Sequence, residues 1–310
     1  MKVGLSTYSM LPAINSGEMS VLDVIQWIAD NGGEHVEIVP FGYKLVDNDK
    51  LIEDIRKKAE DVGIEISNYA ILANLIQEDD EAYENEIKRL MNEVDIAHKL
   101  GVKMMRHDVS AFRRPANQNT IIHYVKDLPK MVEGCQRIAD YAAEYGITTT
   151  VENHGFYVNG SDRVIQLIHE VNRSNYKMTL DVGNFLCVDE DAVIGVKKCL
   201  PYTNMVHLKD FYYRPSHRDP GDTTEFDCAG QWFTTVNGNY LRGSIIGQGD
   251  LDMWQILKLI KKSGYDGYIS VEFEGMEDCK MGSKVGMANA RRIWDEVERK
   301  FNSFMYLLDI

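Results

Sequence analysis

Ile147-Thr-Thr-Thr-Val-Glu-Asn-His-Gly155 is a run of β-branched residues that ends in a carboxylate, an amide, an imidazole and a glycine. β-Branched residues are typical of a buried strand, and polar side chains directly after a strand are typical of a scaffold that carries chemistry at its rim. The pattern recurs in Lys177–Asn184 with Asp181, in Asn204–Asp210 with His207, and in Tyr268–Gly275 with Glu272. Four strand ends that offer Glu, Asp, His and Glu predict a divalent-metal site with nitrogen and oxygen ligands.

Strand-like and helix-like segments alternate along the whole chain, and glycine follows many of the helices. The expected strands are Val3–Met10, His35–Pro40, Ile64–Leu72, Val102–Val109, Ile147–His154, Tyr176–Val182, Asn204–Phe211 and Tyr268–Phe273. The expected helices are Met19–Asn31, Asp49–Val62, Asp80–Leu100, Thr120–Tyr145, Ser161–Val171, Asp189–Leu200, Met253–Ser263 and Gly282–Phe301. Such strand–helix units pair in parallel and close into a single α/β domain over residues 1–310, a (β/α)8 TIM barrel. A doubly wound open sheet is the competing fold, but no Gly-x-Gly-x-x-Gly follows the first strand.

One stretch is longer than this repeat requires. His207 and Glu272 are more than twice as far apart in sequence as Glu152 and Asp181 are. Residues 212–249 therefore form a long insertion after strand 7, which contains the hairpin-like Phe233–Tyr240. Because long loops after barrel strands lie over the active face, we interpret the insertion as a loop or hairpin over that face. A surface loop or an oligomer contact is the alternative.

Composition and charge exclude several classes of protein. The chain has 310 residues, 44% of them hydrophobic, and a formal net charge of −14, which argues against a nucleic-acid partner. No apolar run is long enough for a membrane span, and Met1–Ser6 leads directly into a strand without a signal peptide. The five cysteines are odd in number and lack CxxC spacing, which indicates reduced thiols. We therefore expect a cytoplasmic protein with no membrane partner.

In a closed barrel, side chains at equivalent height on neighbouring strands converge toward the axis. Glu152, Asp181, His207 and Glu272 lie near the C-terminal ends of inferred strands five to eight. Three carboxylates and one imidazole suit Mn²⁺, Mg²⁺ or Co²⁺ and leave positions open for substrate oxygens. The alternative is that each residue is a separate polar group, paired with a lysine or an arginine.

These motifs also carry a resemblance. Val-Glu-Asn-His, Leu-Asp-Val-Gly-Asn, His-Leu-Lys-Asp, Val-Glu-Phe-Glu-Gly and Gly247–Asp252 resemble segments of the xylose isomerase-like TIM barrel superfamily, the sugar phosphate isomerase/epimerase family. The resemblance implies a metal, with Mn²⁺ preferred, bound by Glu152, Asp181, His207 and Glu272. From the ketohexose 3-epimerases of this superfamily it implies that Glu152 and Glu272 also relay the proton.

Several other side chains are candidates for the same site. His154 departs from the epimerase pattern and indicates a third acid/base group or a contact to a substrate hydroxyl, with a hydrogen-bonded loop histidine as the alternative. His107 ends inferred strand four and is a candidate substrate contact, although it alternates with Arg106, so that one of the two points outward. The remaining candidate substrate contacts are Asn184, Lys209 and Trp232.

We expect a metal-dependent isomerase or epimerase that removes a proton next to the carbonyl of a sugar and forms a metal-stabilised enediolate. The first alternative is a keto-sugar lyase, either an inosose-type dehydratase or the large subunit of a C-glycoside deglycosidase that cleaves 3-oxo-glycosides. In that case His154 supplies the extra acid/base. The second alternative is a non-catalytic sugar-binding subunit. A homo-oligomer is expected, or a hetero-oligomer with a small subunit in the deglycosidase case.

Overall fold

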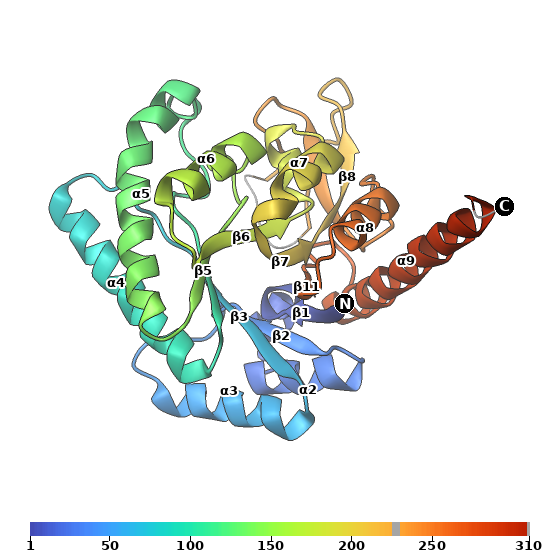
Figure 1. Cartoon of the computed structure of the whole chain (residues 1–310), viewed down its shortest axis with the longest axis horizontal. Coiled ribbons are helices and arrows are strands. Elements are labelled where there is room, and N and C mark those ends of the chain that lie inside the picture. Colours follow the sequence, from blue (N-terminus) through green and yellow to red (C-terminus); the bar gives the residue numbers. More distant parts are fainter. Residues whose placement is uncertain (225–229, 309–310) are drawn as a thin grey trace.

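Eight parallel strands close into a barrel in the order β1–β11–β7–β6–β5–β4–β3–β2, as the sequence predicted (Figure 1). The computed structural model describes residues 1–224 and 230–308, with side chains up to residue 297. The barrel strands are β1 (Lys2–Ser6), β2 (His35–Ile38), β3 (Glu65–Ile71), β4 (Met104–His107), β5 (Thr148–Glu152), β6 (Tyr176–Asp181), β7 (Thr203–Leu208) and β11 (Tyr268–Val271).

Helices surround the strands on the outside of the barrel (Figure 1). The α-helices are α1 (Leu11–Asn15), α2 (Val21–Asp30), α3 (Asp49–Val62), α4 (Asp80–Leu100), α5 (Ile121–Ala143), α6 (Ser161–Val171), α7 (Ala192–Cys199), α8 (Met253–Lys262) and α9 (Cys279–Leu308). Short 3-10 helices are η1 (Thr7–Met10), η2 (Ala116–Gln118), η3 (Asn184–Val188) and η4 (Leu200–Tyr202). Gly63 and Gly101 end α3 and α4 with φ of 74° and 79°, a left-handed conformation that favours glycine.

The first strand is shorter than predicted. Val3–Met10 has a strand-like composition, but β1 ends at Ser6, whose hydroxyl accepts a hydrogen bond from the backbone N–H of Tyr8. With this side-chain cap the chain continues as the 3-10 helix η1 over Thr7–Met10 and not as a strand. As a result Tyr8 lies at the rim of the barrel and lines its cavity.

Two irregularities in strand pairing set which side chains share a level in the barrel. The pairing of β2 with β3 shifts between Val36 and Glu37, so that Glu37 is the partner of Asn68. The pairing of β6 with β7 shifts between Met178 and Thr179, and above this shift Asp181 is the partner of His207. Because a shift of one residue turns a side chain to the other face, these irregularities determine which residues meet inside the barrel.

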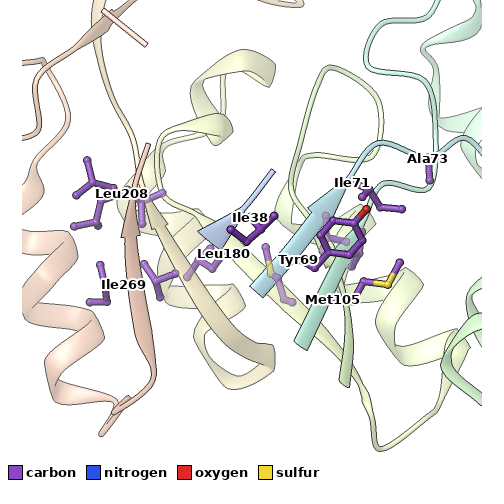
Figure 2. Close-up of a cluster of buried hydrophobic side chains, with 14 of the residues drawn as sticks. Ile38, Tyr69, Ile71, Ala73, Met105, Leu180, Leu208 and Ile269 are labelled. Atoms are coloured by element: carbon purple, nitrogen blue, oxygen red, sulfur yellow. The ribbon is translucent and has the colours of Figure 1, made fainter. Parts of the chain in front are cut away.

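The hydrophobic core lies mainly between the strands and the helices. Figure 2 shows part of this layer, with the labelled side chains Ile38, Tyr69, Ile71, Ala73, Met105, Leu180, Leu208 and Ile269. All of these residues are buried. Burial of apolar area on this scale is the main stabilising term for the barrel and leaves its C-terminal rim free to carry polar residues.

Between β7 and α8 the chain forms a small antiparallel sheet in the order β8–β10–β9, with β8 (Asp210–Arg214), β9 (Phe233–Thr234) and β10 (Tyr240–Ser244). The predicted insertion 212–249 covers most of this segment, and residues 225–229 within it lie outside the described residues. That the segment covers the active face stays a prediction. None of the helices that the structure describes has both the length and the apolar character needed to cross a bilayer.

Candidate metal centre and active site

The structure brings the four predicted ligands together at the C-terminal rim. Glu152 and Asp181 end β5 and β6, His207 lies on β7, and Glu272 directly follows β11, so the four residues come from adjacent strands. One ligand atom from each residue lies within 4.8 Å of the ligand atoms of the other three. All four side chains are buried.

The imidazole of His207 lies at the centre of this group. Its Nδ1 is 3.6 Å from Oε1 of Glu152 and 3.5 Å from Oε1 of Glu272. Its Nε2 lies 2.9 Å from Oε1 of Glu37 on β2. Burial lowers the pKa of His207, but the negative charges of Glu37, Glu272 and Glu152 outweigh this effect and raise the pKa well above its ordinary value. These carboxylates therefore favour the protonated imidazole in the absence of a cation, and a metal would compete with that proton.

Two fixed cations hold the carboxylates from either side. Arg106 on β4 places Nε 2.7 Å from Oε2 of Glu152, and Lys209 places Nζ 3.0 Å from Oε2 of Glu272 and 3.4 Å from Oδ2 of Asp181. Burial raises the pKa of Glu152, but Arg106 and then His207 hold it well below the ordinary value. For Asp181, burial raises the pKa to about 6, because the charge of Lys209 compensates only in part.

Three observations test whether these residues suit a divalent cation. His207 Nδ1 and Asp181 Oδ2 are buried without a hydrogen-bond partner. The donor set of three carboxylates and one imidazole matches the ligands of Mn²⁺ and Mg²⁺. Among the described residues, the connected buried network contains six carboxylates, namely Glu37, Asp108, Glu152, Asp181, Glu272 and Glu274, and their cationic partners are Arg106, Lys209 and the protonated form of His207. A buried excess of negative charge of this size fits a cation.

A cavity of about 200 Å³ opens above these residues. It is lined by Tyr8, Val39, Phe41, Ala70, Ile71, Leu72, Arg106, Phe112, Glu152, His154, Asn184, Cys187, His207, Lys209, Phe211, Glu272 and Glu274. The lining thus combines charged side chains with aliphatic and aromatic ones, and aromatic rings lie beside polar groups, as Phe112 does beside His154. A ligand that fills the cavity would contact both kinds of surface.

His154 faces this cavity and is part of a hydrogen-bonded pair. Its Nδ1 lies 3.1 Å from Oδ1 of Asp108, and the same carboxylate oxygen is 3.0 Å from Nη2 of Arg106. The ring of Phe112 packs against the imidazole with a centroid distance of 4.9 Å. When Nδ1 donates to Asp108, Nε2 carries the lone pair and can accept a proton, which is the arrangement of a general base.

The other predicted substrate contacts differ in their position. Asn184 and Lys209 line the cavity, and Asn184 Nδ2 donates to Oε1 of Glu152 at 3.0 Å. Trp232 does not line the cavity; its ring lies 4.7 Å from the guanidinium carbon of Arg214.

His107 does not line the cavity either. It is the strand partner of Ile71, its ring centroid lies 6.2 Å from that of Tyr176, and its Nδ1 lies 2.8 Å from the backbone oxygen of Asp108. Successive strand residues point to opposite faces, and it is the neighbouring Arg106 that lines the cavity.

Several buried polar residues of the site were not among the candidates predicted from the sequence. Asp108 and Glu274 are buried, and Glu274 accepts a hydrogen bond from the hydroxyl of Tyr8 at 3.1 Å and lies 3.6 Å from Nζ of Lys209. Glu274 follows Glu272 by two positions, so the two-residue period of a strand was a usable signal. Glu37 had no such signal, because it lies on a strand far away in sequence.

Comparison with known proteins places these features in a family context. Residues 25–297 match the family described as xylose isomerase-like TIM barrel. An inosose dehydratase of Lacticaseibacillus casei is 24% identical over 199 residues, which span 62% of this chain and 64% of that protein, less than two thirds of its length.

Solved structures give the same fold. An L-ribulose 3-epimerase superposes with a TM-score of 0.73 at 15% identity, and the superposition covers 98% of both chains. A probable 3-DHS dehydratase from Bacillus anthracis superposes with a TM-score of 0.71 at 18% identity, with coverage of 93% of this chain and 98% of that chain.

Proposed function

Because the chain belongs to the xylose isomerase-like TIM barrel family, we propose that it is a divalent-metal-dependent enzyme that removes a proton next to the carbonyl group of a sugar or keto-sugar. The observation that carries the proposal is the group of four ligand side chains beside the His154–Asp108 pair. Relatives named as inosose dehydratases and structures named as epimerases support the same first step, because both reactions act next to a carbonyl.

Glu152, Asp181, His207 and Glu272 would hold the cation, with Mn²⁺ as our first choice and Mg²⁺ or Co²⁺ as alternatives. When bound, the cation supplies Lewis acidity that makes a hydrogen next to a substrate carbonyl easier to remove. The chain's own part is to orient the ligands: Asn184 donates to Glu152, and Lys209 contacts both Asp181 and Glu272. Asn184 and Lys209 also line the cavity, where they can donate to substrate oxygens.

His154 is the proton carrier that the geometry favours. It lines the cavity, and because Asp108 occupies Nδ1, Nε2 is the ring nitrogen that remains to accept a proton. The resemblance implied Glu152 and Glu272 as proton carriers, but Oε2 of Glu152 is ion-paired with Arg106, and its Oε1 accepts from Asn184. Glu272 is ion-paired with Lys209 in a similar way, so both carboxylates are weak bases that suit a ligand role. We keep Glu272 as the second carrier because the resemblance implies it.

Isomerisation or epimerisation is the reaction that we propose first. In epimerisation His154 and Glu272 would act from two sides of the reacting carbon, one removing the proton and the other returning it. Both residues line the cavity, and they come from the segments that follow β5 and β11, with β6 and β7 between these two strands in the barrel. Free ketohexoses are then the simplest substrates to test.

A keto-sugar lyase is the second candidate, and the apolar residues that line the cavity favour it. Phe41, Leu72 and Phe112 line the cavity together with the charged residues, and a free sugar would leave these apolar side chains without an apolar partner. A 3-oxo-glycoside with an apolar leaving group would offer contacts to both the charged and the apolar residues. In this reaction His154 removes the proton next to the carbonyl, the bond between the sugar and the leaving group breaks, and the leaving group takes up a proton from the site or from solvent. The products, an unsaturated keto-sugar and the free leaving group, differ from those of an epimerase.

Substrate incubation in deuterated solvent distinguishes these reactions. The protein is loaded with Mn²⁺ and incubated with ketohexoses and, separately, with a 3-oxo-glycoside of an aromatic alcohol. Epimer formation with solvent deuterium supports the isomerase, whereas release of the aromatic alcohol supports the lyase. A protein that takes up no cation and exchanges no substrate proton would favour the remaining alternative, a non-catalytic sugar-binding subunit.

The proposed role of His154 has its own test. Replacing a general base slows turnover by about 10²–10⁴-fold, and we expect this loss for His154→Gln. The matched control is His98→Gln, which removes an exposed imidazole on α4 and should leave turnover unchanged. Equal rates for His154→Gln and the unmodified protein would contradict the assignment.

A homo-oligomer is our expectation for the assembly, with a hetero-oligomer containing a small subunit in the deglycosidase case. Light scattering after size-exclusion chromatography of the purified chain measures its own assembly. A chain that releases aromatic alcohol only after a second subunit is added would support the hetero-oligomer.

A further inference from the structure

Glu37 is a buried carboxylate that lies beside His207 and does not line the cavity. It is on β2, fully buried, and its Oε1 lies 2.9 Å from Nε2 of His207. The same oxygen accepts a hydrogen bond from Nδ2 of Asn68 on β3 at 2.7 Å. The three residues form a chain of contacts from Asn68 through Glu37 to the imidazole at the centre of the candidate metal site.

The irregular pairing of β2 with β3 creates this chain of contacts. The pairing passes from Val36 with Ile66 directly to Glu37 with Asn68, so that Ser67 is an extra residue in β3. Such bulges redirect side chains, and without it Glu37 would be paired with Ser67. The hydroxyl of Ser67 instead contacts the backbone oxygen of Val36. The bulge therefore gives Glu37 an amide donor that holds its carboxylate in place.

The partners of Glu37 differ from those of an ordinary structural carboxylate. Glu93 on α4 is also buried, but it is ion-paired with Arg89 and accepts from the hydroxyl of Tyr69 at 2.6 Å. Within the described part of the chain, the ion pair found for Glu37 is with His207 and involves no lysine or arginine. The carboxylate of Glu37 therefore interacts mainly with the imidazole of His207.

The contact between Glu37 and Nε2 of His207 determines which ring nitrogen of His207 is available to bind a cation. An imidazole whose Nε2–H donates to a carboxylate has its lone pair on Nδ1 in the neutral form. Nδ1 is the atom that lies 3.6 Å from Glu152 and 3.5 Å from Glu272, and it has no hydrogen-bond partner. A carboxylate behind a histidine ligand also makes the free nitrogen more basic and fixes the orientation of the ring.

We propose that Glu37, held by Asn68, is a positioning residue that directs Nδ1 of His207 toward the cation. This inference rests on the proposed function, because it assumes that the four ligands bind a divalent cation. Glu37 acts through His207 and contacts neither substrate nor cation. Replacing Glu37 is therefore expected to weaken cation binding directly and to slow turnover only as a consequence of weaker cation binding.

Titration calorimetry of Mn²⁺ tests the proposal on the metal-free protein. Glu37→Gln keeps an acceptor for Nε2–H but removes the charge, and we expect Mn²⁺ to bind about tenfold more weakly. Glu37→Met removes both the charge and the acceptor, and about 100-fold weaker binding is expected. Glu93→Gln is the matched control, a buried carboxylate away from the site, and should bind Mn²⁺ like the unmodified protein. Dissociation constants within twofold of the unmodified protein for both Glu37 variants would overturn the inference.

A second measurement needs no Glu37 variant and so does not depend on its folding. Nitrogen-15 spectra of histidine side chains in the unmodified protein with Mg²⁺ report which ring nitrogen carries the proton, and His207→Gln identifies the signals. A proton on Nε2 and none on Nδ1 is expected, and the opposite tautomer would overturn the inference. If the unmodified protein binds no divalent cation, the proposed function fails and this inference fails with it. If it binds Mn²⁺ and the Glu37 variants bind equally well, this inference alone fails.

Discussion

The stability of the barrel should depend on pH through His35, a buried histidine on β2. Its Nε2 lies 3.1 Å from the backbone oxygen of Ile269, and burial lowers its pKa from 6.5 to about 4. As the pH falls from 6.5 toward 4, the unfolded chain takes up a proton at this position and the folded protein does not. The free energy of unfolding therefore falls over this range, and the contribution of neutral His35 is fully present only above pH 6.5.

The size of the effect follows from the two pKa values. A difference of about 2.5 in pKa corresponds to about 3 kcal/mol when the protonation difference is complete, and to about 2.5 kcal/mol at pH 4.5. His35→Gln replaces the imidazole with an amide that can still donate to Ile269 but does not titrate. Between pH 7.5 and 4.5, the unmodified protein should thus lose about 2.5 kcal/mol more stability than His35→Gln does.

Urea unfolding at both pH values, followed by circular dichroism in the presence of EDTA, measures this difference without a contribution from bound metal. His98→Gln, at an exposed position on α4, controls for the loss of an imidazole as such. Equal losses of stability between the two pH values in the unmodified protein and in His35→Gln would refute the proposed contribution of His35.

Three further predictions concern the frame of the barrel and the cation. The carboxylate of Asp210 accepts hydrogen bonds from several backbone N–H groups, among them that of Gly247 at 2.8 Å, so Asp210→Asn should lower the free energy of unfolding by about 2–3 kcal/mol, and hydrogen exchange at Gly247 should speed up. A Cβ on Gly4 would lie 2.1 Å from the backbone oxygen of His35, so Gly4→Ala should destabilise the protein by about 3 kcal/mol or prevent folding. A Cβ on Gly286 would have its nearest neighbour at 3.3 Å, so Gly286→Ala should destabilise the protein much less. Similar melting temperatures for the two variants would contradict this. Addition of Mn²⁺ at about 100 times its dissociation constant should stabilise the EDTA-treated protein by about 2.7 kcal/mol, and an unchanged melting temperature would argue against a cation site.

Much of the fold could be predicted from local pattern. The β-branched runs, the glycines after helices and the repeat of strand–helix units define a closed barrel without reference to any contact, because each unit buries its own apolar face. The first strand shows the limit of this approach. Val3–Met10 has the composition of one strand, but the hydroxyl of Ser6 caps the next turn, and composition does not reveal such a local hydrogen bond.

The residues of the site could be predicted from sequence where each strand end carries one candidate side chain. They could not be predicted where the pairing of strands decides which of two neighbouring side chains lines the cavity. Glu152, Asp181, His207 and Glu272 could be grouped because each ends an apolar run. Arg106 and His107 both end a strand, and sequence alone could not tell which of them lines the cavity. That choice depends on the register of β4 against its neighbours, which pairs Arg106 with Thr150 on the face of β5 that also carries Glu152.

Charge balance explains why the site needs contributions from strands that the sequence pattern did not single out. Carboxylates buried this close together repel one another, and a barrel that held only ligands would be strongly destabilised without its cation. Arg106 and Lys209 each bridge two or more of these carboxylates and so reduce the repulsion, but they leave His207 Nδ1 and Asp181 Oδ2 without hydrogen-bond partners. Arg106 on β4 and Lys209 directly after β7 thus reduce the destabilisation of the metal-free barrel, while the ligands come from β5, β6, β7 and the residue after β11. Ligand identity can therefore be read from short motifs, whereas the ability of this barrel to hold those ligands is a property of the closed ring of strands.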